Sequence, residues 1–199
     1  MRASIVALAC FCVLGVGCDE PTPDARSPRL GESSARSESP ESGEVRAGMF
    51  ETRRYAVPIP DGFERSREVP GMLVTRERRP HAESFLTSIL INEIPYPDPA
   101  DRSDLSDPAT CERAASDIVA IIEAQGREAE GFRTEVIELP VGRSCRYRFN
   151  LSGDEPHTSQ GTTLQSDAAD FMVVCNIAEG DTQGRAACDE VVRGWRWKS

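Results

Sequence analysis

The pattern of hydrophobic and polar positions divides the chain into an apolar segment, a polar segment and a region with regular periodicity. Ile5 to Gly17 is apolar, with one positive charge ahead of it at Arg2. Residues 19–48 are rich in Ser, Pro, Glu, Arg and Gly and hold hardly any large apolar side chain. Such a segment cannot bury enough apolar surface to offset the entropy of ordering, so we expect a disordered tether. The periodic region predicts one domain over residues 49–199.

Short apolar runs in the first third of this domain predict three strands. Arg54 to Val57 ends at prolines and a turn, and Met72 to Arg78 is amphipathic. Ser84 to Ile94 has apolar residues at both odd and even positions. Because successive side chains of a strand point to opposite faces, this third segment is typical of a central strand covered on both sides.

The second half of the domain alternates more clearly. Phe132 to Leu139 and Arg143 to Leu151 are separated by Pro140-Val141-Gly142, which predicts a hairpin. On the second of these strands, Cys145 shares one face with Tyr147, Phe149 and Leu151. Two further strands are expected, a weak one from Thr158 to Gln165 and a strong one from Asp170 to Ile177.

Two segments carry helical spacing. The first begins at Asp107-Pro108, with Asp as the cap and Pro at the first helical position, and ends at Gln125-Gly126. The second runs from about Arg185 to Arg193. The element order predicts an α+β domain with a mostly antiparallel sheet of about six to seven strands and two main helices packed on it.

Residues 55–63 read Tyr-Ala-Val-Pro-Ile-Pro-Asp-Gly-Phe, an extended strand followed by prolines and an aromatic residue after Gly. This resembles the opening of PsbP-like domains, which include bacterial DcrB-type lipoproteins. The element order and the closing helix with Trp195 are similar too, so the resemblance covers about Met49 to Ser199. It implies an α/β/α sandwich used for binding, assembly or accessory roles, and no catalytic signature comes with it.

The apolar segment has the layout of a secretory signal over residues 1–17 and is too short to span a bilayer, which needs about 20 residues. Its end, Leu14-Gly15-Val16-Gly17-Cys18, resembles the lipobox of bacterial lipoproteins, which implies a lipidated Cys18 and a membrane-anchored protein of the bacterial cell envelope. The domain would then face the periplasm or the cell exterior. Lipoboxes usually carry Leu where Gly15 stands, so a secreted protein with Cys18 as a free thiol is the alternative.

The cysteine count agrees with export. Of the seven cysteines, Cys10 and Cys12 leave with the signal, and four lie in the domain. In an oxidising compartment these predict two disulfides, for which sequence allows three pairings. We favour Cys111–Cys145, because both cysteines lie on apolar faces that should meet, and Cys175–Cys188, because a short loop joins their elements. A redox pair would need C-x-x-C, and no two cysteines have zinc-ligand spacing.

Charge bears on the class of partner. The net charge of −10 argues against nucleic acid, whose phosphates require clustered Lys and Arg. Two Arg groups stand out against this acidity and could receive an anionic ligand or partner, or pair across strands with residues such as Glu135. They are Arg76, Arg78 and Arg79, and Arg143, Arg146 and Arg148.

Metal and catalytic signals are weak. Asp98, Asp101 and Asp104 are spaced like a loop that could hold Ca²⁺, but prolines restrict the loop and a solvated polar loop is the simpler interpretation. The two histidines, His81 and His157, have no catalytic partner suggested by local sequence, and no G-x-S-x-G is present. We expect no cofactor. Asp189 and Glu190 are expected on the exposed side of the last helix.

The sequence therefore favours a non-catalytic binding or assembly module of the bacterial envelope, anchored through Cys18, with an envelope protein as its partner. The alternative is an envelope hydrolase or metal-dependent enzyme whose site is assembled from distant residues. A binding module predicts a shallow surface patch. An enzyme predicts a cleft in which polar side chains converge on a histidine or on carboxylates with shifted pKa values.

Lipidation can be tested by substituting Cys18. In a bacterial host fed labelled palmitate, the C18A variant should lose the label and move from the membrane to the soluble fraction, because two acyl chains supply the anchor. The C10A variant removes a cysteine of the signal instead and should keep both label and location. Label retained by C18A would contradict the prediction.

Overall fold

The computed structural model describes residues 44–46, 48–75, 87–98, 100, 102–153 and 156–198. Several residues singled out from the sequence lie outside these ranges. They are the signal segment, Cys18, Arg76, Arg78, Arg79, His81 and Asp101.

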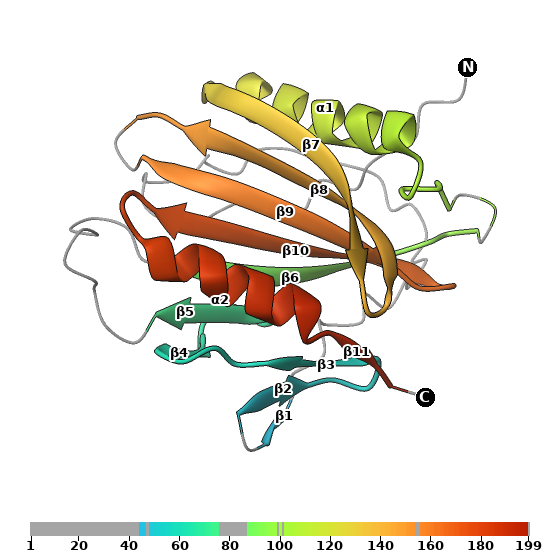
Figure 1. Cartoon of the computed structure of the whole chain (residues 1–199), viewed down its shortest axis with the longest axis vertical. Coiled ribbons are helices and arrows are strands. Elements are labelled where there is room, and N and C mark those ends of the chain that lie inside the picture. Colours follow the sequence, from blue (N-terminus) through green and yellow to red (C-terminus); the bar gives the residue numbers. More distant parts are fainter. Residues whose placement is uncertain are drawn as a thin grey trace, which may run out of the picture. The chain divides into compact units, whose positions relative to one another are not determined.

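Two antiparallel sheets and two helices make up the described part (Figure 1). The helices are α1 (Pro108–Ala124) and α2 (Thr182–Arg193). The larger sheet has seven strands in the order β4-β5-β6-β10-β9-β8-β7, and the smaller has the order β1-β2-β3-β11. The strands are β1 Glu44–Arg46, β2 Met49–Glu51, β3 Tyr55–Pro58, β4 Phe63–Arg65, β5 Met72–Thr75, β6 Ser88–Pro95, β7 Ala129–Leu139, β8 Gly142–Leu151, β9 His157–Gln165, β10 Ala169–Ala178 and β11 Arg196–Trp197.

This arrangement confirms the α+β fold class, with seven antiparallel strands in one sheet and two helices. The predicted hairpin is β7 and β8, which pair from Ala129↔Leu151 to Leu139↔Gly142. The strands β9, β10 and β6 follow beside it, all antiparallel. The prediction missed β2, β4 and β11, because strands of two or three residues are too short to show an alternation of their own.

The start of ordered structure also differs from the prediction. Residues 18–48 were assigned to the tether, but Glu44–Arg46 form β1, so that assignment is wrong for these three residues. They pair with β2 from Glu44↔Glu51 to Arg46↔Met49. The turn between the two strands contains Gly48 at φ 77°, a backbone conformation that glycine adopts without steric cost. The described structure therefore begins earlier than composition predicted, because backbone pairing with β2 does not depend on apolar side chains.

The helix α1 packs on one face of the large sheet. Asp107 caps it by accepting a hydrogen bond from the Thr110 backbone N–H at 2.9 Å, as the sequence predicted. Its buried side chains include Ala115, which packs with Tyr147, Phe149 and Leu151 of β8. These three residues are the alternate positions predicted to share a face, so the apolar stripe of the helix and that of the strand meet as expected.

The helix α2 and the small sheet share the main core with the opposite face of the large sheet. Val191 and Val192 of α2 are fully buried and cluster with Phe171 and Val173 of β10. The small sheet adds apolar side chains such as Val57 to the same cluster. The aromatic residues of this core pack at 4.3 to 5.6 Å between ring centroids, and they are Tyr55, Phe171, Trp195 and Trp197.

One disulfide ties each helix to the sheet face that it covers. Cys111 of α1 is bonded to Cys145 of β8, with a Cα–Cα distance of 5.3 Å. Cys175 of β10 is bonded to Cys188 of α2, with a Cα–Cα distance of 6.1 Å. These are the two pairs favoured from the sequence. In the chain-entropy description, closing loops of 34 and 13 residues stabilises by about 4 and about 3 kcal/mol.

Removing either disulfide should lower the free energy of unfolding, and removing Cys111–Cys145 should lower it more than removing Cys175–Cys188. The double variant C111A/C145A is expected to lose about 4 kcal/mol and C175A/C188A about 3 kcal/mol, measured by urea unfolding with Trp fluorescence. A reductant should destabilise the wild type and have less effect on each variant. Unfolding midpoints equal to that of the wild type would show that the bonds do not form in solution.

Candidate functional site

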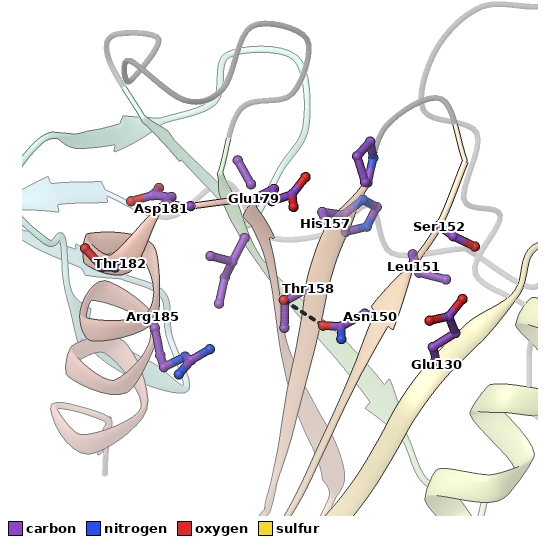
Figure 2. A pocket seen from close by; sticks show the side chains of 14 residues that line it. Glu130, Asn150, Leu151, Ser152, His157, Thr158, Glu179, Asp181, Thr182 and Arg185 are labelled. Atoms are coloured by element: carbon purple, nitrogen blue, oxygen red, sulfur yellow. Dashed lines mark hydrogen bonds between the residues drawn. The ribbon is translucent and has the colours of Figure 1, made fainter.

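A cleft of about 510 Å³ lies between the first turn of α2 and the adjoining ends of β7, β8 and β9. Figure 2 shows Arg185 and Thr182 on the α2 side and Asn150, Thr158 and Glu130 across from them. The remaining lining residues are Leu151, Ser152, Pro156, His157, Ile177, Ala178, Glu179, Gly180 and Asp181. The lining therefore combines polar and charged side chains with apolar ones such as Leu151 and Ile177.

The sheet side of the cleft is fixed by cross-strand pairing. Asn150 of β8 and Thr158 of β9 are register partners, and the Thr158 hydroxyl donates to Asn150 Oδ1 at 2.9 Å. The next pairs along the same face are Arg148↔Gln160 and Arg146↔Thr162. Because residues two apart on a strand share a face, the two arginines lie on the same face of the sheet as Asn150, beyond the residues that line the cleft.

The helix side of the cleft is fixed at the start of α2. Asp181 caps the helix by accepting from the Gly184 backbone N–H at 2.9 Å. The Thr87 hydroxyl donates to Asp181 Oδ2 at 2.5 Å and accepts from the Ala178 backbone N–H at 3.1 Å. At Gly184, an added Cβ would lie 2.8 Å from Thr87 Cγ2, so glycine lets the first turn of α2 approach β6 and β10 this closely. One side of the cleft is therefore attached directly to the sheet.

Arg146 connects the sheet to α2 through a largely buried ion pair. Its Nη2 lies 3.0 Å from Asp189 Oδ1, and its Nη1 lies 3.8 Å from Glu135 Oε1 of β7. The side chain of Arg146 is 9% exposed and that of Asp189 is 34% exposed. The pairing with Glu135 was one of the two interpretations offered by the sequence. The pairing with Asp189 was not foreseen. Asp189 was expected on the exposed side of the last helix, but it is only partly exposed because it pairs with Arg146 of the sheet.

Arg148 lies next to this pair without a carboxylate of its own. Among the described residues, its Nε is buried and has no hydrogen-bond partner. Partial burial, together with the positive charges of Arg185 and Arg146, lowers the pKa of Arg148 from its ordinary value, and Glu135 and Asp189 offset this only in part. A guanidinium stays protonated in proteins regardless, so the lowered pKa describes a cation in an unfavourable position.

Gln160 is a second polar residue on this face of the sheet with an incomplete set of hydrogen bonds. It is 1% exposed, and its Nε2 donates weakly to Cys188 Sγ at 3.4 Å and to Asp189 Oδ1 at 3.5 Å. In the part of the chain that the structure describes, its Oε1 accepts no hydrogen bond. Buried side-chain oxygens are usually satisfied, so an unmatched Arg148 donor opposite an unmatched Gln160 acceptor is uncommon.

Of the two histidines, His157 is the one that the structure describes, and it lies in the cleft. It is 7% exposed and shares the lining with Ser152 and Glu179. A buried histidine, a serine and carboxylates in one cleft are part of what the enzyme alternative predicts. The sequence contained no signal for this arrangement, because the residues come from three separate elements.

Asp98 and Asp104, the described carboxylates of the predicted calcium loop, accept hydrogen bonds from residues two positions further along the chain. Asp98 Oδ1 accepts from the Ala100 backbone N–H at 2.9 Å. Asp104 Oδ1 accepts from the Ser106 hydroxyl at 2.6 Å and from its backbone N–H at 3.0 Å, and these bonds lower the pKa of Asp104. Within the described ranges, no group of three or more His, Cys, Asp or Glu is placed to hold a metal ion. Likewise, neither described helix has the length and apolarity of a membrane span.

Comparisons with known proteins gave similarity at the level of solved structures. No family model and no curated protein matches the sequence. The chain is similar to the solution structure of PsbP (CyanoP) from Synechocystis sp. PCC 6803, with 18% identity, a TM-score of 0.49 and coverage of 72% of this chain and 86% of that one. PsbP is the kind of domain that residues 55–63 resemble.

Two further structures show comparable similarity. One is LpqN, involved in cell envelope biogenesis of Mycobacterium tuberculosis, with 15% identity, a TM-score of 0.47 and coverage of 73% of this chain and 83% of that one. The other is a mutant of the protein Mog1, with 16% identity, a TM-score of 0.45 and coverage of 71% and 89%. At identities of 15 to 18%, these similarities bear on the fold and not on the function.

The ion pair that joins the sheet to α2 should matter for stability. The D189N variant leaves the buried Arg146 cation with only the distant Glu135 carboxylate, so we expect a loss of about 1–3 kcal/mol in the free energy of unfolding. The E138Q variant breaks the exposed pair between Arg143 and Glu138, whose side chains are 50% and 79% exposed, and should change stability by less than about 0.5 kcal/mol. Equal effects of the two substitutions in urea unfolding would contradict this assignment.

Proposed function

We propose that the chain is a lipid-anchored, non-catalytic module of the bacterial cell envelope that binds an envelope component in the cleft beside α2. The observation that carries this proposal is the cleft itself. About 510 Å³ of open space is bordered by polar side chains from α2 on one side and from β7, β8 and β9 on the other. Concave sites with a few placed polar groups are the usual form of a ligand site.

The construction of the cleft supports a binding role. Its helix side is held by the Cys175–Cys188 bond and by the hydrogen bonds of Asp181, and its floor is held by strand pairing. A site whose walls are already in place loses little conformational entropy when a ligand binds, so more of the contact energy appears as affinity. The cleft therefore has the preorganisation that a binding module needs.

The position at the envelope is supported by the sequence and by the disulfides together. Two disulfides persist in oxidising compartments such as the periplasm or the cell exterior and are rare in the cytosol. The secretory layout of residues 1–17, the lipobox-like segment ending at Cys18 and the polar composition of the following residues fit a domain held near a membrane by a tether.

His157 favours a second candidate function, that of an envelope hydrolase. It lines the cleft with Ser152 and Glu179, and histidine is the side chain most often used for proton transfer near neutral pH. The two candidates differ in what happens to the bound component. A binding module releases it unchanged, whereas a hydrolase releases it cleaved, and only the hydrolase depends on His157 for that change.

Site-specific photo-crosslinking in living cells tests the binding role. A photo-reactive amino acid in place of Thr182, which is exposed and lines the cleft, should give a crosslinked product that mass spectrometry identifies as one envelope component. The same amino acid in place of Ser116, exposed on α1 outside the lining, is the matched control and should not give that product.

Two results would count against this function. Identical products from the Thr182 and Ser116 positions would show that the cleft has no selective role. Release of the identified component in cleaved form by the wild type, and intact by the H157Q variant, would replace the binding module with the hydrolase.

A further inference from the structure

The strand β7 forms one edge of the large sheet, and within the described residues no strand pairs with its outer side. With 11 residues it is the longest described strand, about twice the mean strand length of globular proteins. Such an edge presents a row of unpaired backbone N–H and C=O groups, which is a template for pairing with another chain. Soluble proteins usually block their edges with charged side chains. The charges of β7 therefore decide whether this edge repels or accepts a partner.

Two exposed charges of opposite sign share one face of β7. Arg133 and Glu135 are two residues apart, so their side chains lie on the same side of the sheet. Glu135 Oε1 lies 3.8 Å from Arg146 Nη1 of β8. Arg133 is instead opposite Arg148 in the register of β7 with β8, and like charges at such positions destabilise a sheet. Arg133 therefore lacks a carboxylate on the neighbouring strand.

The spacing of these charges is complementary to itself. When β7 of a second copy pairs antiparallel with Thr134 opposite Thr134, Arg133 of each copy lies opposite Glu135 of the other. Two-fold symmetry forms this opposite-charge pair twice. On the other face of the strand, the same register places Phe132 opposite Val136, an aromatic and β-branched pair. Both are partly exposed in the single chain, so pairing buries more of each.

The same two charges disfavour the neighbouring registers. A two-fold axis at position 133 places Arg133 opposite itself, and an axis at position 135 places Glu135 opposite itself. Axes further along the strand bring no Arg133 opposite a Glu135. A run of charges of one sign would repel in every register, whereas this pair selects one register and opposes slippage.

The surroundings of β7 limit how far such pairing extends. The register shift between Glu130 and Arg133 interrupts the regular ladder near the start of the strand, so the favoured alignment covers residues 132–136. The helix α1 is bonded through Cys111 to Cys145 of β8, the second strand from the edge, and covers one face of the hairpin. An incoming strand would instead approach in the plane of the sheet.

We propose that the outer edge of β7 pairs antiparallel with the β7 edge of a second copy of this chain, with Thr134 on the two-fold axis. The two seven-stranded sheets then continue as one. Glu135 of the second copy supplies the carboxylate that Arg133 lacks beside Arg148. Because the paired ladder is short, the dimer is weak and forms in a concentration-dependent way. This interface is separate from the proposed role of the cleft.

Disulfide trapping of the full domain tests the alignment. Cα atoms directly opposite each other are about 4.5–5.5 Å apart, within the range for a disulfide, so T134C should form a covalent dimer under mild oxidation. The four native cysteines of the domain are already paired with each other. E138C is the matched control on the same strand. Its two thiols would lie about 25 Å apart, at about 3.3 Å per residue, and should give no covalent dimer.

Charge reversal tests the recognition. In sedimentation equilibrium, the wild type should dimerise, and R133E should weaken dimerisation roughly 10- to 100-fold, because both attractive pairs become repulsive. R133E also places a carboxylate opposite Arg148, so its Tm should be equal to or higher than that of the wild type. The double variant R133E/E135R reverses both charges and should recover dimerisation. R127E, in the exposed turn after α1, should dimerise like the wild type.

Three results would overturn the proposal. The first is the mass of one chain at every protein concentration, without a covalent T134C dimer. The second is equal trapping of T134C and E138C, which would indicate random collision. The third is trapping of T134C in cells by a different protein and not by itself, which would assign the edge to another partner. T134C trapping contains neither charge reversal, so it decides the question even when a reversed variant folds poorly.

Discussion

The attachment of α2 to the large sheet is the constraint on which the cleft depends. The Cys175–Cys188 bond fixes the middle of the helix over β10. Because Asp189 directly follows Cys188, the same bond places its carboxylate within 3.0 Å of Arg146 on β8. Arg185 precedes Cys188 by three residues, about one helical turn, and so lies over the cleft. One covalent bond thus sets the positions of a structural carboxylate and of a side chain that lines the site.

The two helices make different kinds of contact with the two faces of the large sheet. On the α1 face, Ala115 and its neighbours close over Tyr147, Phe149 and Leu151, and the contact is apolar. On the α2 face, the helix covers β10 with Val191 and Val192, while the neighbouring strands β8 and β9 present Arg146, Arg148 and Gln160. The first face contributes stability through apolar burial. The second leaves a polar strip beside a helix, which is where the cleft lies.

Within that strip, the charges fall into two groups with different physical roles. Arg146 is nearly buried and has two carboxylates, so its charge is compensated inside the fold. Arg148 is near Arg185 and Arg146, Glu135 and Asp189 offset this only in part, and the buried Nε of Arg148 has no partner among the described residues. A fold optimised for stability alone would not hold cations in this way, because desolvation and mutual repulsion both oppose it. The cost falls on the α2 face of the sheet, next to the ion pair of Arg146.

Local pattern was enough to determine the main elements. Alternation predicted the β7–β8 hairpin, and a cap and a glycine predicted the limits of α1. Apolar faces favoured the cysteine pair 111–145, and a short connecting loop favoured the pair 175–188, among three possible pairings. The short strands β1, β2, β4 and β11 were missed because their residues become strands only through the partners they meet. The cleft could not be predicted for the same reason. Asp189 and Arg146 are far apart in sequence, and so are Arg185 and Arg148; strand register and the path of α2 decide that they meet, and long-range packing alone determines both.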